Sequence, residues 1–445
     1  MATSIDSETL IAGLQRAVER QPEARVLTAW LSLANGALTF QEHYQKALQQ
    51  RELTYLTLDT TGACDLTCHG MCYYHPDIRL RDPQVPEGKL LAAIESAINN
   101  LALQNLTVVG KEPFLNPARL FGILEFAGGR KTSQLSIGIV SNGRNCSRHW
   151  DRLEQCSASG ALDFFDISLD SGFAEQHDAM RGVPGTFDLA FQAVAQSVRR
   201  LPSTRVGITS VIRNDNQPGL LELLRSGAHG GVRYFCFVPI QPPPFTTTPS
   251  LHATDLVEFF VAVSEVLGRE LAGAGIEVIA SLNGISLLEC EQHGFFSWAD
   301  FRENREGQIY TSCDIAGNNL VFNFAVLPDY GDRLARITYN GSYLAHAHFL
   351  QTPDPDKYAV GNINDEPITA LFERGKRLHF RDVIQSRRHH MCQRRPCWNN
   401  CFGGWTIAEH AFLTGQALES QPALCTKRES DFGVLEDRWR QSAAL

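Results

Sequence analysis

Between residues 55 and 240 the sequence alternates between short apolar stretches and longer amphipathic ones, and this alternation restricts the possible fold more than any other feature. The apolar stretches are rich in β-branched and aromatic residues, which predicts strands. They cover residues 55–60, 105–110, 135–143, 162–170, 204–212 and 232–240. The amphipathic stretches predict helices at 87–103, 117–127, 185–199 and 216–227. Strands joined by helices indicate a parallel sheet with right-handed crossovers, either an α/β barrel or an open part of one.

The unusual residues of the sequence follow the predicted strands. In parallel α/β folds, the chemistry gathers where the strands end. Cysteines follow the first strand, "GKEP" (110–113) the second, "SNG" (141–143) the third, and "SLDS" (168–171) lies at the end of the fourth. The sequence therefore predicts one site at the C-terminal edge of the sheet.

The stretch 63–76, "ACDLTCHGMCYYHP", holds Cys64, Cys68 and Cys72. A spacing of four residues would put the three thiols on one face of a helix. The stretch follows a predicted strand, however, and it contains glycine and proline, which indicates a loop. Three thiols on a loop at the end of a strand are typical of metal ligands.

The identity of the metal depends on the number of ligands. A structural zinc site usually takes four protein ligands, so His69 or His75 would have to complete one. A [4Fe-4S] cluster held by three cysteines instead leaves one iron free to bind something else. The loop by itself leaves both alternatives open.

Composition narrows the class of protein. The chain has 445 residues, of which 43% are hydrophobic and 20% charged, as in an ordinary globular protein. A dispersed net charge of -9 argues against a nucleic-acid binder. The first residues lack the pattern of a secretory signal, and no stretch approaches the roughly 18 apolar residues of a membrane span. We therefore expect a cytoplasmic protein that binds neither nucleic acid nor a membrane.

Twelve cysteines in that compartment favour metal binding or catalysis over disulfides. Four of them stand alone in the sequence and are predicted to be small buried apolar residues. These four are Cys146, Cys156, Cys236 and Cys290.

Taken together, the motifs resemble those of radical S-adenosylmethionine (radical SAM) enzymes over roughly residues 50–245. The resemblance rests on the cysteine loop, "GKEP", "SNG", "DISLDS" and "HDAMRGVPGTFD" (177–188), in the expected order. It implies a partial (β/α)6 TIM-like barrel. The later cysteine-rich region resembles the auxiliary-cluster extension called SPASM.

The sequence departs from the family pattern at two places. The usual loop is C-x3-C-x2-C with an aromatic residue before the third cysteine, whereas here Met71 stands there and Cys72 comes one residue late. The family usually has two glycines before Glu-Pro, and here Lys111 replaces the second.

The resemblance implies that Cys64, Cys68 and Cys72 hold a [4Fe-4S] cluster whose open iron binds S-adenosylmethionine. Electron transfer from the cluster would yield a 5'-deoxyadenosyl radical that removes hydrogen from a substrate. A flavodoxin or ferredoxin would supply the electron. The implied cofactor-binding residues are Gly110, Lys111, Glu112, Pro113, Asn142, Ser168, Asp170 and Arg181. Plainer roles stay open for Asn142 in a turn, Asp170 as a cap and Arg181 in a surface ion pair.

The rest of the chain is predicted to form further regions. Residues 1–50 are predicted to be a helical extension, and the radical SAM core covers 51–245. The prolines of "QPPPFTTTPS" (241–250) mark a connector, so 246–276 reads as linker and helix, with Thr254 as the cap. Residues 277–445 would be the SPASM-like domain, with a hairpin in 333–349 turned at Asn340-Gly341.

An auxiliary [4Fe-4S] cluster is expected on Cys392, Cys397, Cys401 and Cys425. The same four thiols would also suit zinc. Against the usual seven cysteines of SPASM the region lacks two, and His346 stands where a cysteine is expected. A second auxiliary cluster would use Cys313, with or without His346.

Enzymes with this arrangement often oxidise or cross-link residues of a peptide, so the leading hypothesis is a peptide-modifying radical SAM oxidoreductase. Oxidation or rearrangement of a small metabolite is the alternative within the same chemistry. A metal-binding scaffold without catalysis is the alternative outside it. The residues do not single out a general base.

Overall fold

The computed structural model confirms the partial α/β barrel. It describes residues 53–68, 71–72, 74–76, 78, 84–101, 103–240, 251, 253–282, 290, 293–296, 300, 302–303, 309–324, 334–345 and 347–377. All six predicted strands are present, each within two residues of the predicted start. They are β1 (Tyr55–Asp59), β2 (Asn105–Val109), β3 (Ser136–Ser141), β4 (Phe164–Ser168), β5 (Arg205–Ile212) and β6 (Tyr234–Pro239).

These strands belong to one sheet that continues beyond the predicted barrel core at both ends. Its order is β13-β12-β11-β1-β2-β3-β4-β5-β6-β7-β10-β9-β8. The added strands are β7 (Glu277–Leu282), β8 (Arg302–Glu303), β9 (Ile309–Ile315), β10 (Asn318–Phe324), β11 (Leu334–Ile337), β12 (Ser342–Leu344) and β13 (Gly361–Asn362). Strands β11 through β10 in this order pair in parallel, and the outer pairs are antiparallel. Among the described strands the sheet therefore stays open.

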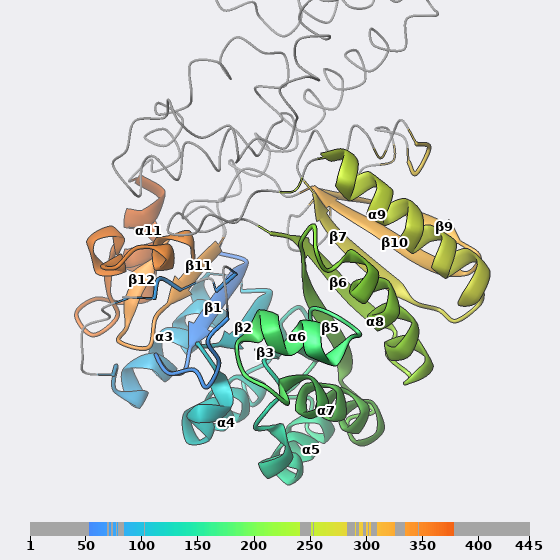
Figure 1. Ribbon diagram of the computed structural model, residues 1–445. Coiled ribbons are helices and arrows are strands. Elements are labelled where there is room, and N and C mark those ends of the chain that lie inside the picture. Colours follow the sequence, from blue (N-terminus) through green and yellow to red (C-terminus); the bar gives the residue numbers. More distant parts are fainter. Residues whose placement is uncertain are drawn as a thin grey trace, which may run out of the picture.

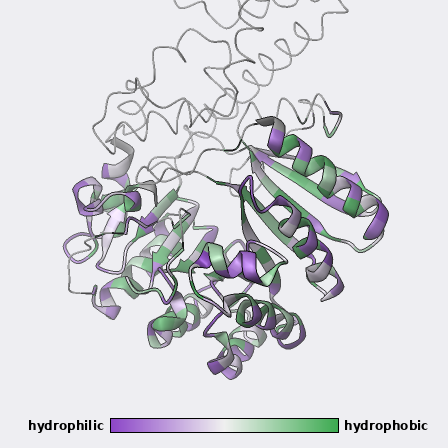
Figure 2. Ribbon diagram, viewed as in Figure 1, coloured by the Kyte–Doolittle hydropathy of each residue, from purple (hydrophilic) through white to green (hydrophobic). Residues whose placement is uncertain are grey.

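Helices cover the outer side of this sheet (Figure 1). They are α3 (Glu87–Asn100), α4 (Pro117–Gly128), α5 (Trp150–Ala158), α7 (Thr186–Arg200), α8 (Gln217–His229), α9 (Ala253–Glu265) and α11 (Ile368–Arg377). The short helix α6 (Ala174–Arg181) packs on α7 beside the C-terminal end of β4. The four predicted helices correspond to α3, α4, α7 and α8. Figure 2 shows strands that are mostly hydrophobic and helices that carry hydrophilic residues as well, as expected for helices with one solvent-facing side.

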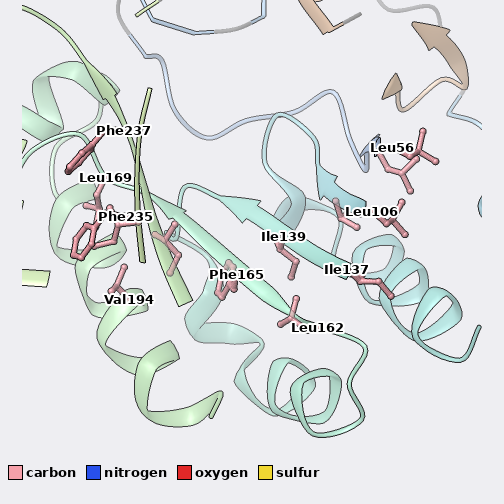
Figure 3. Packing of buried hydrophobic residues seen from close by; sticks show 14 of the residues in the cluster. Leu56, Leu106, Ile137, Ile139, Leu162, Phe165, Leu169, Val194, Phe235 and Phe237 are labelled. Carbon is pink, nitrogen blue, oxygen red and sulfur yellow. The ribbon is translucent and has the colours of Figure 1, made fainter. Parts of the chain in front are cut away.

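Alternate residues of each strand point into the layer between sheet and helices. Phe165, Ile167, Ile208 and Phe235 have no exposed surface. Figure 3 shows Phe165 and Phe235 in this core, with Val194 of α7 close by. This packing fixes which face of every strand is turned toward the helices.

The other residues of each strand, which alternate with those of the core, point to the inner, concave face of the sheet. Many of them are partly exposed. Thr57, Val140, Ser168, Thr209 and Cys236 are half-buried, although their neighbours along the strands are buried. Since the core side of the sheet is closed by helices, this exposure belongs to the inner face. The inner face is thus accessible above the middle of the barrel.

The segment after residue 245 differs from the sequence prediction in detail. Helix α9 begins at Ala253, so the prediction that Thr254 caps it is wrong, because Thr254 already lies inside the first turn. The hairpin around Asn340-Gly341 is confirmed by the antiparallel pair β11 and β12, with Gly341 at φ +89°. No helix among the described residues is long and apolar enough to span a membrane.

Gly138 in β3 provides a test of the packing on the inner face. A methyl group there would overlap the ring of Phe164 on β4. We expect Gly138→Ala to lower the free energy of unfolding by about 1–3 kcal/mol, the usual effect of overpacking. Chemical denaturation would measure it.

Gly88→Ala is the matched control, because a methyl group at Gly88 in α3 meets nothing within 4 Å. This change should be neutral or stabilise the protein by up to about 1 kcal/mol. Equal losses in the two variants would contradict the described contact between β3 and β4.

Candidate functional site

The cysteine loop, defined here as residues 60–76, follows β1 at the C-terminal edge of the sheet. Its described residues form no helix or strand. Cys64 is exposed, and Cys68 and Cys72 are half-buried. None of the three thiols is in a disulfide, so each is available to bind a metal.

Asp65, next to Cys64, ties this loop to the segment that follows β3. Its carboxylate accepts hydrogen bonds from Asn142 Nδ2 (2.8 Å), Arg144 Nη1 (2.9 Å) and Asn145 Nδ2 (2.9 Å). Arg144 Nη1 also donates to the carbonyl oxygen of Asp65 at 2.8 Å. The first part of the loop is therefore held by side chains from a neighbouring strand end.

The Gly110–Pro113 turn after β2 holds the same part of the loop through the backbone. Lys111 N donates to Thr61 O at 3.1 Å, and Glu112 N donates to Ala63 O at 3.0 Å. Gly110 has φ +152°, and a Cβ there would lie 2.9 Å from Thr60 Oγ1. Glycine is thus required where the two segments meet.

Glu112 lies fully buried between β2 and β3. Its Oε1 accepts from Ser141 Oγ (2.9 Å) and Phe114 N (3.1 Å), and its Oε2 accepts from Asn142 N (2.9 Å). Burial raises the pKa of the Glu112 carboxyl to about 7, against the opposite effect of these hydrogen bonds. The side chain positions the ends of β2 and β3 relative to each other.

The end of α6 holds the second part of the loop. Thr67 N donates to Arg181 O at 3.2 Å, and Thr67 Oγ1 donates to Gly182 O at the same distance. Arg181 Nε forms an ion pair with Asp170 Oδ2 at 2.7 Å. Burial raises the pKa of the Cys68 thiol, and the adjacent guanidinium of Arg181 opposes that effect.

Asp170 is completely buried, and both its side chain and its backbone form hydrogen bonds. Its Oδ1 accepts from Val211 N (2.9 Å), its N donates to His177 Nδ1 (3.1 Å), and its O accepts from Asn216 Nδ2 (2.8 Å). Burial lowers the pKa of His177 to about 4, so the ring is neutral at pH 7. This network fixes α6 against the end of β4.

The last part of the loop contacts the C-terminal half of the chain. Tyr74 OH donates to Asp59 Oδ1 at 3.0 Å, and Arg336 Nε of β11 donates to the same oxygen at 3.0 Å. Arg336 also bonds to Tyr74 OH. Lys111 Nζ lies 5.4 Å from the centre of the Tyr74 ring. The residue that replaces the family's second glycine is therefore directed at the lengthened cysteine loop.

The donor set suits an iron-sulfur cluster. Among the described residues, no three His, Cys, Asp or Glu side chains are grouped to hold a single metal ion. A cubane takes one thiolate on each of three different irons, so its ligands lie farther apart than those around one ion. The three free thiols of the loop are the donors that such a cluster would need.

The remaining predicted residues are distributed as follows. Ser168 ends β4 on the inner face and is half-exposed. Cys313 lies in β9, and the sheet order puts β9 at the end opposite to β11. Cys146, Cys156 and Cys290 are buried as predicted, whereas Cys236 is half-buried. His346, Cys392, Cys397, Cys401 and Cys425 lie outside the described residues.

Sequence reasoning missed Asp65, Arg144, Asn145 and Arg336. Asp65 sits between two ligand candidates and reads as an ordinary loop residue. The nearness of Arg144 and Asn145 to "SNG" was a usable signal. Nothing in the sequence connects Arg336 to Asp59, because the two are 277 positions apart and meet only through the pairing of β11 with β1.

Fold and site together define a partial α/β barrel with a thiol-bearing loop at the C-terminal edge of its sheet. Residues 58–227 match the sequence model of the Radical SAM superfamily. This stretch of the chain is therefore similar to the radical SAM domain, and such a domain indicates an enzyme that uses a [4Fe-4S] cluster and S-adenosylmethionine. No curated protein sequence matches the chain.

Solved structures share the fold at low sequence identity. SuiB of Streptococcus suis bound to the precursor peptide SuiA is 15% identical, with a TM-score of 0.60, and the match covers 83% of this chain and 76% of that chain. Another structure of SuiB is 14% identical, with a TM-score of 0.59, and the match covers 91% of this chain and 90% of that chain. Native anSMEcpe with bound AdoMet and Kp18Cys peptide is 16% identical, with a TM-score of 0.56, and the match covers 88% of this chain and 98% of that chain.

Removal of the Asp65 carboxylate tests the bracing of the loop. Asp65→Ala leaves three donors without their acceptor, which should destabilise the loop by about 1–3 kcal/mol. We expect less iron and sulfide per chain after anaerobic reconstitution than in wild type. Glu95→Ala removes an exposed ion pair with Arg130 and should keep the wild-type iron content. Full iron in Asp65→Ala would contradict the proposed bracing.

The buried ring of His177 predicts a pH-dependent stability. The folded protein binds fewer protons than the unfolded chain between the ordinary pKa of 6.5 and about 4, so stability falls as the pH drops through that window. Between pH 7 and pH 5 we expect this ring to contribute a loss of about 2 kcal/mol. Urea denaturation of wild type and His177→Phe at both pH values measures it. An equal loss in both proteins would show that His177 does not contribute.

Proposed function

We propose that this protein is a radical SAM oxidoreductase that removes a hydrogen atom from a residue of a peptide. The observation that carries the proposal is the cysteine loop, which three separate segments hold at the C-terminal edge of the sheet. These are the Gly110–Pro113 turn, the residues after β3 and the end of α6. A metal-binding loop held in this way keeps its thiols in a fixed arrangement beside the inner face.

In this proposal Cys64, Cys68 and Cys72 hold a [4Fe-4S] cluster with one open iron. When bound and reduced, the cluster with S-adenosylmethionine supplies a 5'-deoxyadenosyl radical that abstracts hydrogen from substrate. The protein supplies positioning and electrostatics. Arg181 places a positive charge beside Cys68, which favours its thiolate form, and Asp170 keeps that guanidinium oriented.

The residues proposed to bind S-adenosylmethionine surround the same loop. The backbone of Gly110, Lys111, Glu112 and Pro113 faces the loop and suits the amino group of the methionine part. Ser168 offers a partly exposed hydroxyl on the inner face. Asn142 and Asp170 act by positioning, because Asn142 bonds to Asp65 and Asp170 is buried.

A peptide substrate is supported by the solved structures of SuiB with a precursor peptide and of anSMEcpe with a peptide, both of the same fold. The accessible inner face offers room for a substrate side chain. We further propose an auxiliary [4Fe-4S] cluster on Cys392, Cys397, Cys401 and Cys425 in a SPASM-like domain, and a flavodoxin or ferredoxin as electron donor. The division of the chain at residues 246 and 277 remains part of this proposal.

The triple variant Cys64→Ala, Cys68→Ala, Cys72→Ala tests the proposal. We expect anaerobically reconstituted wild type to hold about eight irons per chain, from two four-iron cubanes, and the variant about four. Wild type should form 5'-deoxyadenosine from S-adenosylmethionine under reducing conditions, and the variant should form none.

The buried cysteine Cys156 provides the matched control, since Cys156→Ala removes a thiol of the core and should keep the wild-type iron content. Equal iron in the triple variant and wild type would assign the iron to other ligands. Absence of 5'-deoxyadenosine from wild type with full iron would overturn the proposed activity.

A further inference from the structure

A second acidic residue lies on the inner face, below the site described above. Asp166 belongs to β4, two positions before Ser168, and its neighbours Phe165 and Ile167 point into the core. The alternation along the strand therefore directs the Asp166 side chain to the inner face. The carboxyl leans across β5, because a Cβ at Gly207, its partner in register, would overlap Asp166 Oδ1.

The Asp166 carboxyl has no partner among the described residues. The residue is only 9% exposed, and Oδ1 is buried without a hydrogen bond. No ion pair is formed with Arg205, the nearest cation, whose guanidinium lies 3.8 Å from the ring centre of Tyr234 and 5.2 Å from that of Phe164. Asp166 differs in this respect from Glu112 and Asp170, because each of their carboxylate oxygens has a hydrogen-bond or ion-pair partner.

An unpartnered buried carboxyl is unfavourable for folding, since burial removes water without supplying a substitute. Burial accordingly raises the pKa of Asp166 to about 6, although Arg205 acts in the opposite direction. A buried polar group without a partner at the accessible face of a barrel points to a ligand that completes the site. The side of Asp166 toward the cysteine loop is lined by Ser168, Thr209 and Cys236, all of which are half-buried.

The charges on this face favour a cation. Two further charged side chains lie near the level of Asp166, Arg205 and Glu277, and Glu277 is on β7 opposite Tyr234. Closer to the cysteine loop, Asp59 is already paired with Arg336. The balance of Asp166, Glu277 and Arg205 is negative, and of the three it is Asp166 that has a buried oxygen without a hydrogen bond. A cation that carries N–H donors would balance the negative charge and would also supply the missing hydrogen bond. Hydrogen bonds from a charged donor to a carboxylate are stronger than those between neutral groups.

We propose that Asp166 is a specificity-determining residue that binds the amine or guanidinium of a lysine or arginine of the peptide substrate, inserted along the inner face of the barrel. The inference rests on the proposed function, and it adds the chemical class of the residue that enters the barrel. An apolar or acidic side chain would leave the carboxyl unpaired and would be disfavoured.

The test uses Nα-acetyl-lysine N-methylamide and Nα-acetyl-arginine N-methylamide as probes, and the norleucine analogue as an uncharged probe of similar length. Saturation-transfer difference NMR with the reconstituted full chain detects binding at millimolar concentration. We expect signals from at least one basic probe and none from norleucine. Asp166→Asn should weaken the binding of the basic probe by about tenfold or more, since the charge-assisted bond is lost.

Two further variants separate a specific role from a general disturbance. Gly207→Ala keeps the carboxyl but places a methyl group in its position, so it should also weaken binding. Glu95→Gln removes an exposed carboxylate of the outer helix α3 and should leave the binding of the probe unchanged. Binding that survives in Asp166→Asn, equal binding of norleucine, or no binding of either basic probe to wild type would each overturn the inference.

A separate measurement distinguishes this inference from the proposed function. Formation of 5'-deoxyadenosine by wild type is followed on the same preparation. Activity without binding of either basic probe would reject only the role of Asp166. Binding through Asp166 without formation of 5'-deoxyadenosine would reject the proposed function and keep the carboxyl as a cation-binding group.

Discussion

The site depends on the hydrogen bonding of a loop that has no regular structure of its own. A metal-binding loop must present its thiols in a fixed arrangement, but the described part of this one has no helix or strand to do so. Asp65 replaces that support, because its carboxylate gathers three donors from the segment after β3. The backbone of the Gly110–Pro113 turn and the end of α6 add further contacts. The loop is thus shaped by the strand ends around it.

The same dependence connects the two halves of the chain. Arg336 reaches Asp59 because β11 pairs in parallel with β1, which puts a residue from the C-terminal half beside the start of the cysteine loop. A buried ion pair of this kind adds little net stability, but loss of one partner leaves an uncompensated charge. Asp59, Tyr74 and Arg336 therefore act as one unit, which makes the position of the loop sensitive to the C-terminal hairpin.

Three buried acidic residues have different roles because their hydrogen-bond and ion-pair partners differ. Glu112 accepts three hydrogen bonds and joins two strand ends, and Asp170 is fixed by an ion pair with Arg181 and by backbone contacts. Asp166 has neither kind of partner. The first two stabilise the site, whereas the third is a cost to folding that a ligand would remove. Sequence alone treats all three as residues at or near the ends of strands.

The sequence by itself determined the six central strands, four of the helices between them (α3, α4, α7 and α8, but not α5 or α6) and the edge at which the unusual residues gather. These features are local, since hydrophobic period and turn residues depend on neighbours along the chain. Only the tertiary structure decided that β7, β10 and β11 extend the sheet, that Asp65 braces the loop and that Asp166 lacks a partner. Such facts arise from contacts between residues far apart in sequence, and hydrophobic pattern carries no information about which distant polar groups will meet.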